Sequence, residues 1–494
     1  MNQSLLEKVD FGHDEAENDF NLVRYFLETD SFFRIFKGDK MYVIGRKGTG
    51  KSAIYLTIEN LQIPEITASG LTFDDYSWVI HNKIRDESKS IDFAHVNTWK
   101  YIILLELAKL LIRESNFLQK SFHPGLKKVA NFLEKNYGSL RPSYREFLVD
   151  KFRRIRRLDL PSISLQGLKL GGIEFDERVS AEERLITDIN IVNHELQDIV
   201  FSAMSAKHYF ILFDKLDDGW DASEEFKSSM VGLLKAARDL NIESKKANKD
   251  LRAIVFLRSD IYDVLQYNDK NKAFADIEFL RWDKEKLITL ISKRIAFSIE
   301  VDEKNAWHRI FEKNKMRSRT SNVSYLIKRT FLRPRDIISF CRECLNEAKR
   351  NNRNIITNED IYNAESFYSE RVYREFLDEM HKQHRYVEKL FSALRAIKTE
   401  RFDFQMFEKE YNKDLFRIQN LTAQDALKIL FEYDIIGIQR IGGKTGGSTF
   451  DFSYNDPLIK IDFSKEMVIH PALKKHLKLV EKRTYETPQG DLGF

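Results

Sequence analysis

One stretch of this 494-residue sequence has residue types and spacing suited to holding a polyphosphate. Glycine, four residues, glycine, lysine and serine follow in order, as Gly45, Arg46, Lys47, Gly48, Thr49, Gly50, Lys51 and Ser52. Glycines let backbone N–H groups turn inward around phosphates, and a helix starting at the loop favours the same anion. A lysine here reaches the β- and γ-phosphates, and the serine hydroxyl ligates Mg²⁺. We predict a nucleoside triphosphate site from Gly45 to Ala53; the alternative is a strand–turn–helix corner with coincidental glycines.

A second candidate for chemistry is the acid that ends the apolar run Tyr209–Asp214. Five apolar residues before a carboxylate predict a buried strand of a parallel sheet, with Asp214 at its C-terminal end. There it is expected opposite the serine of the phosphate loop, holding Mg²⁺ through water. A second acid usually follows and polarises the attacking water, but this chain has Lys215. Asp217 is therefore the preferred base and Asp218 the next; the alternative is an ordinary buried strand with an acidic turn.

Two arginines are candidate contacts to the γ-phosphate. Ala253–Leu257 predicts another buried strand, and Arg258 follows it as the first candidate, with Ser259 and Asp260 as alternates. A proline followed by Arg335 predicts a helix start, from which a guanidinium of a lid domain can reach the phosphates. For the first arginine the competing role is purely structural, and for the second it is charge capping of the helix.

Strands and helices are expected to position these residues. Tyr42–Ile44 predicts the strand before the phosphate loop, and a helix should follow the loop. Ile91–Val96 predicts a second strand, and Trp99–Arg113 a long, mostly apolar helix. Residues 20–27, ahead of the loop, predict an amphipathic helix. This leader either packs on the sheet edge or contacts the nucleotide base, and we weigh the two equally.

The C-terminal part has the layout of a winged helix. Helices are predicted at Tyr386–Ile397, Phe402–Asn412 and Ala423–Tyr433, then a strand at 435–440, a glycine-rich tip at 442–447 and a returning strand at 448–454. The segment 468–471 and a predicted helix at Ala472–Val480 close it. Upstream, a basic run at 151–157 precedes a predicted small hairpin. That run either tracks a nucleic-acid backbone or is a solvated helix face, and we favour the solvated face.

The predicted fold class is α/β, a P-loop NTPase core with a parallel sheet and helical additions. The expected domains are a leader helix at 1–40, a core at 41–265 with a helical insertion at about 114–190, a helical lid at 266–380, a winged-helix-like domain at 384–482 and a tail at 483–494.

Composition says more about the compartment than about the partners. The 80 basic and 76 acidic side chains give a net charge of +4, which says little about partners. The most apolar run, Tyr101–Ile112, contains Glu106 and Lys109 and is too short to span a bilayer. The two cysteines, Cys341 and Cys344, lack the companions of a zinc site and are expected to be buried and reduced. We expect a cytoplasmic protein with no membrane partner.

The leader Phe11-Gly12…Ala16-Glu17-Asn18-Asp19, together with residues 45–54, resembles a group of free-standing bacterial P-loop ATPases. The chain is also similar in layout to Orc1/Cdc6-type AAA+ proteins and to the signalling ATPases called STAND and KAP. The first resemblance covers residues 11 to about 350. It implies an additional-strand, glutamate-class core that uses ATP and Mg²⁺, a helical lid, and assembly into a homo-oligomer.

Roles follow from the resemblance only where this sequence matches the motifs. Lys51 and Ser52 correspond to the Walker A motif, Asp214 to Walker B, Arg258 to a sensor and Arg335 to a lid sensor. Lys215 departs from the pattern, since relatives often carry a second acid there, and that leaves the catalytic base open. Exposed Arg281 is one candidate for a charge supplied in trans.

Three functions compete at this point. The first is a nucleotide-dependent switch or motor on double-stranded DNA, docked through the winged helix. The second is a signalling ATPase of an anti-phage defence system, whose C-terminal domain binds an effector protein. A small-molecule kinase ranks last, because no acceptor site is readable. The near-zero net charge weakens the DNA hypothesis without removing it.

Overall fold

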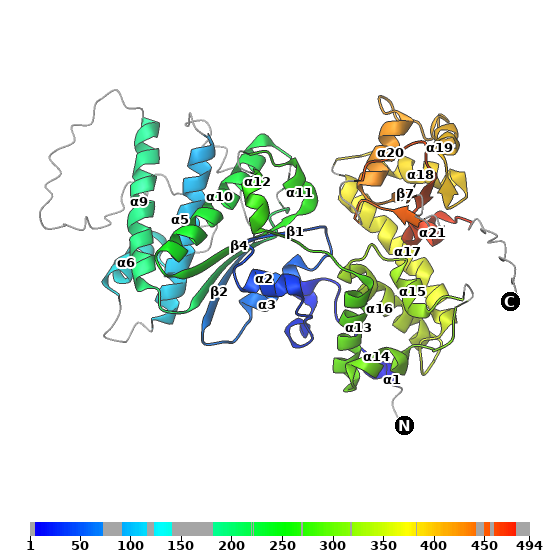
Figure 1. Cartoon of the computed structure of the whole chain (residues 1–494), viewed down its shortest axis with the longest axis horizontal. Helices are drawn as coiled ribbons and strands as arrows, with labels where there is room; N and C mark the ends of the chain where they lie inside the picture. Colours follow the sequence, from blue (N-terminus) through cyan, green and yellow to red (C-terminus); the bar gives the residue numbers. More distant parts are fainter. Residues whose placement is uncertain are drawn as a thin grey trace, which may run out of the picture. The chain divides into compact units, whose positions relative to one another are not determined.

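The structure is a computed structural model that describes residues 5–72, 91–115, 123–140, 181–218, 220, 222–267, 270–316, 319–381, 383–440, 449–454 and 459–480. The chain forms two compact units. One is Glu15–Arg281, and the other combines Met1–Asp14 with Trp282–Phe494. Figure 1 shows both units and labels most of their helices and some of their strands.

A five-stranded sheet forms the centre of the Glu15–Arg281 unit, in the order β2-β3-β4-β1-β5. Its strands are β1 (Tyr42–Gly45), β2 (Ile66–Thr72), β3 (His208–Asp214), β4 (Asp250–Arg258) and β5 (Ile277–Phe279). All neighbouring strands are parallel. The α/β class with a parallel sheet is therefore confirmed. Strand β4 lies between β1 and β3, which is the additional strand that the resemblance implied.

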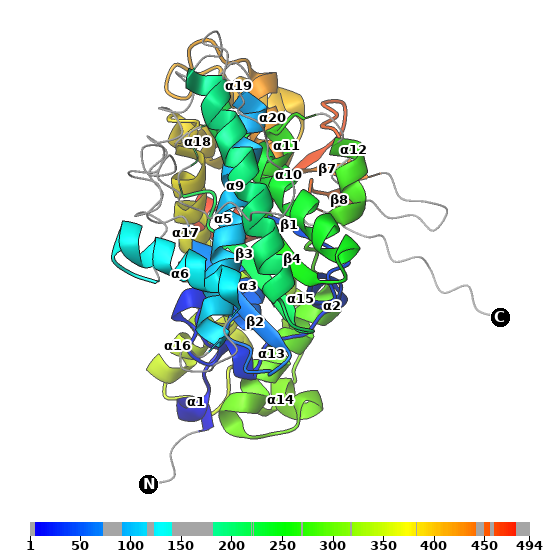
Figure 2. The same ribbon diagram turned by 90° about the vertical axis from the view of Figure 1, so that its left-hand side faces the viewer.

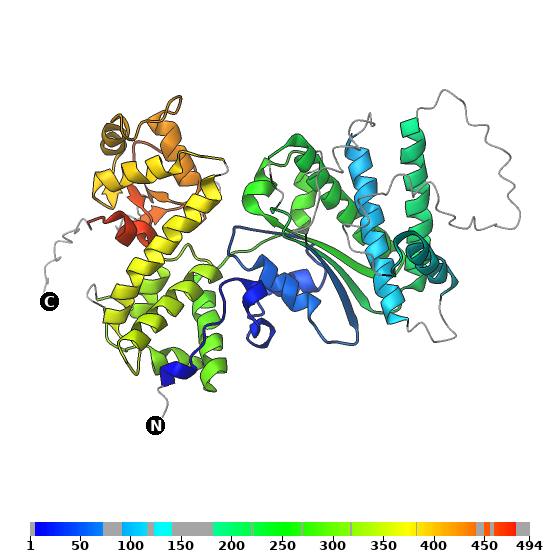
Figure 3. The same cartoon turned by 180° about the vertical axis from the view of Figure 1, so that it is seen from behind.

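Helices cover both faces of this sheet, which explains why its inner strands are apolar on both sides. Tyr209, Ile211 and Phe213 of β3 share a core with α5 and α10, while Phe210 and Leu212 pack with α2 and α3. Figure 2 shows α5, α9 and α10 side by side, and Figure 3 shows the sheet from behind. The helices of this unit are α2 (Asp30–Phe36), α3 (Lys51–Glu59), α5 (Ile91–Glu114), α6 (Pro124–Tyr137), α9 (Ala181–Ala203), α10 (Glu224–Lys246), α11 (Ser259–Val264) and α12 (Lys270–Ala273), with the 3-10 helix η3 (Phe274–Asp276).

The predicted strand at Ile91–Val96 is wrong, because these residues begin the 24-residue helix α5. His95 and Trp99 are both buried on this helix, so the apolar positions follow a helical rather than an alternating period. The second strand in the chain is β2 instead. Its sequence, ITASGLT, lacks a continuous apolar run because β2 lies at the edge of the sheet.

The predicted amphipathic helix at residues 20–27 is also wrong. Two short 3-10 helices occupy this part of the leader, η1 (Ala16–Asn18) and η2 (Leu22–Arg24). Between them the buried Asp19 carboxylate accepts a hydrogen bond from the Tyr25 hydroxyl, which closes a local turn. Phe20 is 99% exposed as a result, rather than packed in a core. Both η1 and η2 pack against α3.

The second unit is a group of helices followed by a small sheet. Its elements are α1 (Leu5–Lys8), α13 (Lys284–Ile299), α14 (Glu303–Ile310), α15 (Asn322–Ile327), α16 (Pro334–Arg350), α17 (Asn358–His381), α18 (Val387–Ile397), β6 (Arg401–Phe402), α19 (Phe404–Tyr411), α20 (Ala423–Glu432), β7 (Ile436–Arg440), β8 (Thr449–Asp451), β9 (Met467–Ile469), η4 (Pro471–Leu473) and α21 (Lys474–Leu477). The antiparallel sheet has the order β6-β9-β7-β8.

The three helices and the hairpin predicted after residue 384 are confirmed as α18, α19, α20, β7 and β8. The closing helix is shorter than predicted, since it ends at Leu477. The predicted tip at 442–447, the basic run at 151–157, the hairpin after it and the tail at 483–494 lie outside the described residues. Across the described part of the chain, no helix has both the length and the apolar character required to cross a bilayer.

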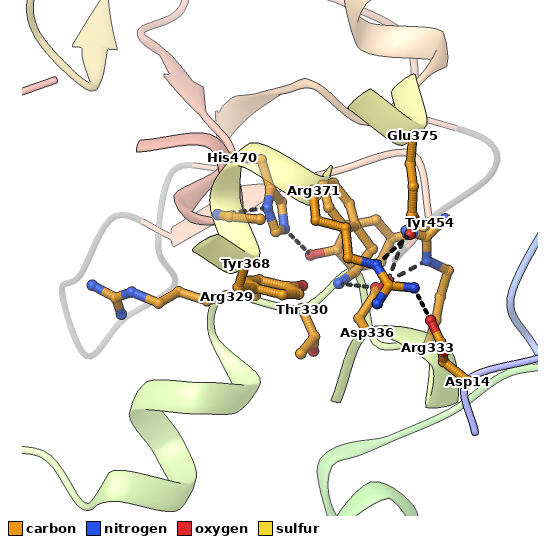
Figure 4. Close-up of polar contacts among 12 residues, drawn as sticks. Asp14, Arg329, Thr330, Arg333, Asp336, Tyr368, Arg371, Glu375, Tyr454 and His470 are labelled. Atoms are coloured by element: carbon orange, nitrogen blue, oxygen red, sulfur yellow. Dashed lines mark hydrogen bonds and ion pairs between the residues drawn. The ribbon is translucent and has the colours of Figure 1, made fainter. Parts of the chain in front are cut away.

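Stacked rings join the small sheet to the helices of the same unit. The His470 ring stacks on Phe331 with centroids 3.8 Å apart. Its Nδ1 accepts a hydrogen bond from the Ala472 backbone N–H, and Nε2 lies 3.4 Å from the Tyr454 hydroxyl (Figure 4). Elsewhere in this unit Cys341 is free and buried in α16, as predicted, and burial raises the pKa of its thiol.

Candidate nucleotide-binding site

The predicted phosphate loop joins the last residue of β1 to the first turn of α3. A side chain at Gly45 has no room, because an added Cβ would lie 2.4 Å from Thr49 Oγ1. Gly48 and Gly50 have φ angles of 83° and 92°, the left-handed region that glycine tolerates best. Arg46 and Lys47 are half-buried in the loop, and Ser52 and Ala53 follow Lys51 in α3. The local structure therefore requires the glycines that the motif supplies.

Lys51 is folded over the loop in this structure. Its Nζ donates to the carbonyl oxygens of Gly45 and Arg46, at 2.8 and 3.1 Å. Burial lowers the pKa of Lys51, while the charges of Asp217 and Asp214 act in the opposite direction. The lysine is thus a half-buried cation with two carboxylates near it. An incoming phosphate can replace the loop carbonyls as its partner.

Asp214 and Ser52 meet at the C-terminal edge of the sheet. Asp214 ends β3, is 3% exposed, and accepts a hydrogen bond from the Ser52 hydroxyl. Burial raises the pKa of Asp214, and the Ser52 hydrogen bond and the Lys51 charge oppose that rise. The proximity predicted from the sequence is therefore present in the fold.

A hydroxyl and a carboxylate oxygen are donors that suit Mg²⁺, which takes few protein ligands and relies on phosphates and water for the rest. The donor set of Ser52 and Asp214 fits this ion. Over the residues the structure describes, no three histidine, cysteine, aspartate or glutamate side chains gather into a metal site. A metal held entirely by such side chains is therefore not seen in this part of the chain.

Arg258 ends β4 and lies between two carboxylates. Its Nη1 is 3.4 Å from Asp217 Oδ2, and its Nη2 is 2.7 Å from Asp260 Oδ2. The charges of all three residues act on Lys51, so the fold brings this group to the phosphate loop. Asp218 is exposed in the turn after β3, and Ser259 begins α11.

Lys215 has an unusual backbone and a partner from the leader. Its φ angle is 56°, rare for a residue with a side chain, and its backbone N–H donates to the Asp214 carboxylate. Lys215 Nζ lies 3.7 Å from Glu17 Oε1 of η1. Sequence reasoning did not assign Glu17 to the site. The leader that carries the resemblance to other ATPases contains this acid, and its place shortly before the phosphate loop in the sequence was the available signal.

Two predicted residues are not joined to this cluster. Arg335 is the second residue of α16 and belongs to the other unit, so its contact with phosphate stays a prediction. Arg281 is exposed at the end of the Glu15–Arg281 unit, and its action in trans is likewise a prediction.

Comparison with known proteins gives one family match and one relative. A family described as "FunZ-associated C-terminal helical domain" matches residues 285–377. The chain is 25% identical over 488 residues to the "Putative transposon gamma-delta 80.3 kDa protein" of Escherichia coli (strain K12). That alignment covers 94% of this chain, and the chain spans 66% of the length of the relative.

Three solved structures are similar at low identity. The Aeropyrum pernix ORC2 protein in ADPNP–ADP complexes gives a TM-score of 0.40 at 11% identity, covering 94% of this chain and 91% of that chain. Drosophila ORC bound to DNA gives 0.29 at 11% identity, over 96% and 90%. Cdc6p from Pyrobaculum aerophilum gives 0.27 at 12% identity, over 89% and 85%. At these scores the similarity does not bear on function.

Proposed function

We propose that this protein binds ATP with Mg²⁺ at Gly45–Ala53 and hydrolyses it as a nucleotide-dependent switch or motor. The observation that carries the proposal is the meeting of Lys51, Ser52 and Asp214 at the C-terminal edge of a parallel sheet. One cation, one hydroxyl and one carboxylate at the end of a glycine loop serve no evident packing purpose. They match the needs of a metal-bound polyphosphate.

Each group has a role in this proposal. Backbone N–H groups of the loop hold the phosphates, and Lys51 moves from the carbonyl oxygens of Gly45 and Arg46 to the β- and γ-phosphates. Ser52 and Asp214 hold Mg²⁺, which neutralises charge on the phosphate oxygens. The helix dipole of α3 adds to the same attraction.

Arg258 is the proposed sensor of the γ-phosphate. Asp217 and Asp260 hold its guanidinium on both sides, so the side chain is oriented before nucleotide binds. We therefore assign Asp217 to holding Arg258 rather than to acting as the catalytic base. Asp218 is a weaker candidate for the base, because its side chain is exposed to solvent.

Lys51→Ala should abolish nucleotide binding while leaving the fold intact, because the hydrogen bonds it removes go to carbonyl oxygens of the loop itself, at Gly45 and Arg46. Asp214→Asn should keep nucleotide but lose hydrolysis, since a neutral amide holds Mg²⁺ poorly. Titration calorimetry with ATP, an ATPase assay and a thermal melt test both variants. Wild-type binding and hydrolysis in Lys51→Ala would disprove the site.

For the partner, the proposal is double-stranded DNA. The order α18, α19, α20 and then the β7–β8 hairpin supports a winged-helix domain, and the similarity to a protein named as a transposon protein supports a role on DNA. The exposed surface of α20 is of mixed charge: Lys428 pairs with Asp425 at 3.0 Å, and Glu432 is exposed. Phosphate contacts are therefore proposed for the hairpin, where Arg440 ends β7, rather than for α20.

The alternative keeps the same ATPase and changes the partner. In that case the C-terminal domain of a STAND-like signalling ATPase gates an effector protein in anti-phage defence. The mixed charge of α20 favours this alternative over a purely electrostatic DNA clamp. Assembly into a homo-oligomer, with Arg281 completing a neighbouring site, belongs to both versions.

A further inference from the structure

Lys215 stands where an acid that orients the attacking water is expected, and its side chain lies beside the carboxylate of Glu17. Lys215 directly follows the proposed metal ligand Asp214 and donates its backbone N–H to that carboxylate. Its left-handed backbone, with φ at 56°, directs the chain into the turn closed by the Asp218 N–H on the Lys215 carbonyl oxygen. The side chain ends 3.7 Å from the carboxylate of Glu17.

We propose that Glu17 of the leader is the catalytic carboxylate that orients the attacking water, and that Lys215 is the positioning residue that holds it at the site. The proposal rests on the ATP hydrolysis proposed above. The catalytic acid expected directly after Asp214 is then supplied by Glu17, which precedes the phosphate loop in the sequence.

The leader is built to hold Glu17 in place. Glu17 lies in η1, which packs on α3, the helix that starts at the phosphate loop. The Asn18 side-chain amide donates to Glu15 at 2.8 Å, and the buried Asp19 accepts from the Tyr25 hydroxyl. These contacts fix the backbone on both sides of the acid. Its own side chain remains 38% exposed, so a bound ligand can reach it.

The other acids near the loop have different partners. Asp214 accepts from Ser52, while Asp217 and Asp260 pair with Arg258. Neutralising either of the Arg258 partners would disturb that arginine. Glu17 is paired instead with Lys215, at 3.7 Å, and its partly exposed carboxylate oxygens can accept a hydrogen bond from water.

The chemistry requires no further reactant. The water oxygen bonds to the γ-phosphorus as the bond to the β–γ bridging oxygen breaks, and that oxygen leaves with its electron pair as part of ADP. Glu17 accepts a hydrogen bond from the water and thereby orients a lone pair of the water oxygen toward the γ-phosphorus. The proton released passes to Glu17 and then to a phosphate oxygen of the products.

Glu17→Gln tests the proposal with the full-length protein. ATP turnover should fall by at least about 100-fold, the usual loss for a general base, while ATP affinity and melting temperature stay unchanged. Glu28→Gln is the matched control, because Glu28 is an exposed acid of the same leader, and its turnover should equal that of the wild type. Chemical quench of pre-bound ATP should show intact ATP on Glu17→Gln.

Exchanging the two charges tests whether the ion pair between Glu17 and Lys215 positions the carboxylate. Glu17→Lys combined with Lys215→Glu keeps the ion pair and puts the carboxylate on residue 215, so it should recover turnover that Glu17→Lys alone loses. A swap as inactive as the single variant overturns the role of Lys215. Wild-type turnover in Glu17→Gln overturns the role of Glu17, and so does a parallel loss of affinity and melting temperature, which marks a structural residue.

The failure of this inference is distinct from failure of the ATPase itself. If the wild type shows no ATP hydrolysis that depends on Lys51, the proposed function fails and this inference fails with it. If wild-type hydrolysis depends on Lys51 and Glu17→Gln matches it, only the assignment of Glu17 is overturned.

Discussion

At the scale of single residues, Asp14 shows how much the second unit depends on one buried charge. Its side chain is 1% exposed and accepts from Arg342 at 3.0 Å and from Arg371. Arg371 Nε also lies 3.2 Å from Glu375 Oε1. Figure 4 draws Asp14, Arg371 and Glu375 together. The carboxylate thereby fixes the leader to α16 and α17. A buried charge of this kind is tolerated only while its partners remain.

Asp14→Asn should destabilise the protein by about 1–3 kcal/mol, because one or both arginines lose their ionic partner in a buried setting. This loss in the free energy of unfolding is smaller than for a fully buried ion pair, because the side chains of Arg342 and Arg371 are 27% and 33% exposed to solvent. Urea unfolding with and without the substitution measures the difference. Glu7→Gln, an exposed acid of α1, is the control and should leave the midpoint unchanged. An unchanged midpoint in Asp14→Asn would contradict the anchoring role.

At the scale of elements, a charged cluster ties together the beginnings of two central strands and the end of α2. His208 opens β3 and lies 2.6 Å from Asp250, which opens β4. Arg252 Nη2 donates to Asp250 at 2.6 Å, and Arg252 Nη1 donates to the carbonyl oxygen of Phe36 at the end of α2. The cluster therefore fixes the N-terminal ends of β3 and β4 relative to the C-terminal end of α2.

This cluster should make the Glu15–Arg281 unit sensitive to acid. Burial by itself raises the pKa of Asp250, but hydrogen bonds from Arg252 and His208 and the charge of Arg252 bring that pKa below its ordinary value of 3.8. A lowered pKa in the folded state means that the unfolded chain takes up the proton first. Stability from this group is complete above the ordinary pKa and is lost as pH falls through the lower folded value.

Asp250→Asn should therefore lower the melting temperature at neutral pH and lose that difference from the wild type in acid, below the ordinary pKa of 3.8. Melting curves of both proteins from neutral pH downward measure the difference. Asp198→Asn, which removes an exposed partner of His194, should change the melting temperature little at any pH. A constant gap between Asp250→Asn and wild type over the whole range would show that Asp250 does not titrate as described.

At the scale of the whole molecule, the chain passes between the two units at two places. Asp14 belongs to one unit and Glu15 to the other, and the chain passes between the units again at Arg281 and Trp282. Glu17 is therefore only three residues from the Asp14 anchor. A nucleotide-dependent change at the phosphate loop has two covalent routes to the helices that precede the C-terminal domain.

Duplex binding by the full-length protein tests the proposed partner. Affinity should fall steeply with salt, with a log–log slope of about −0.9 for each phosphate contact, and should change when ATP is added. Arg440→Glu together with Lys444→Glu, which lies in the tip outside the described residues, should weaken binding to all sequences and flatten the slope. Lys313→Glu with Lys315→Glu makes the same charge change on another exposed segment and is the control. Binding that ignores salt and the hairpin charges would favour a protein partner.

The sequence by itself determined those features of this protein that depend on residues close together in the chain. The loop from Gly45 to Ser52 could be predicted because its glycines, Lys51 and Ser52 lie within eight residues, and the turn into α3 requires glycine at the positive φ angles of Gly48 and Gly50. The strands ending in Asp214 and Arg258 could be predicted because strands covered on both faces are continuous apolar runs. The helices after residue 384 could be predicted because their apolar residues follow the helical period.

Only the tertiary structure decided the features that depend on distant parts of the chain. Strand β2 escaped prediction because an edge strand needs no continuous apolar run, and Ile91–Val96 was misread because a short segment does not define a period. The pairing of Glu17 with Lys215, and of Asp217 with Arg258, follows from how η1 packs on α3 and how β3 and β4 align. Such contacts are set by strand register and helix packing, which act over distances in sequence that no local pattern records.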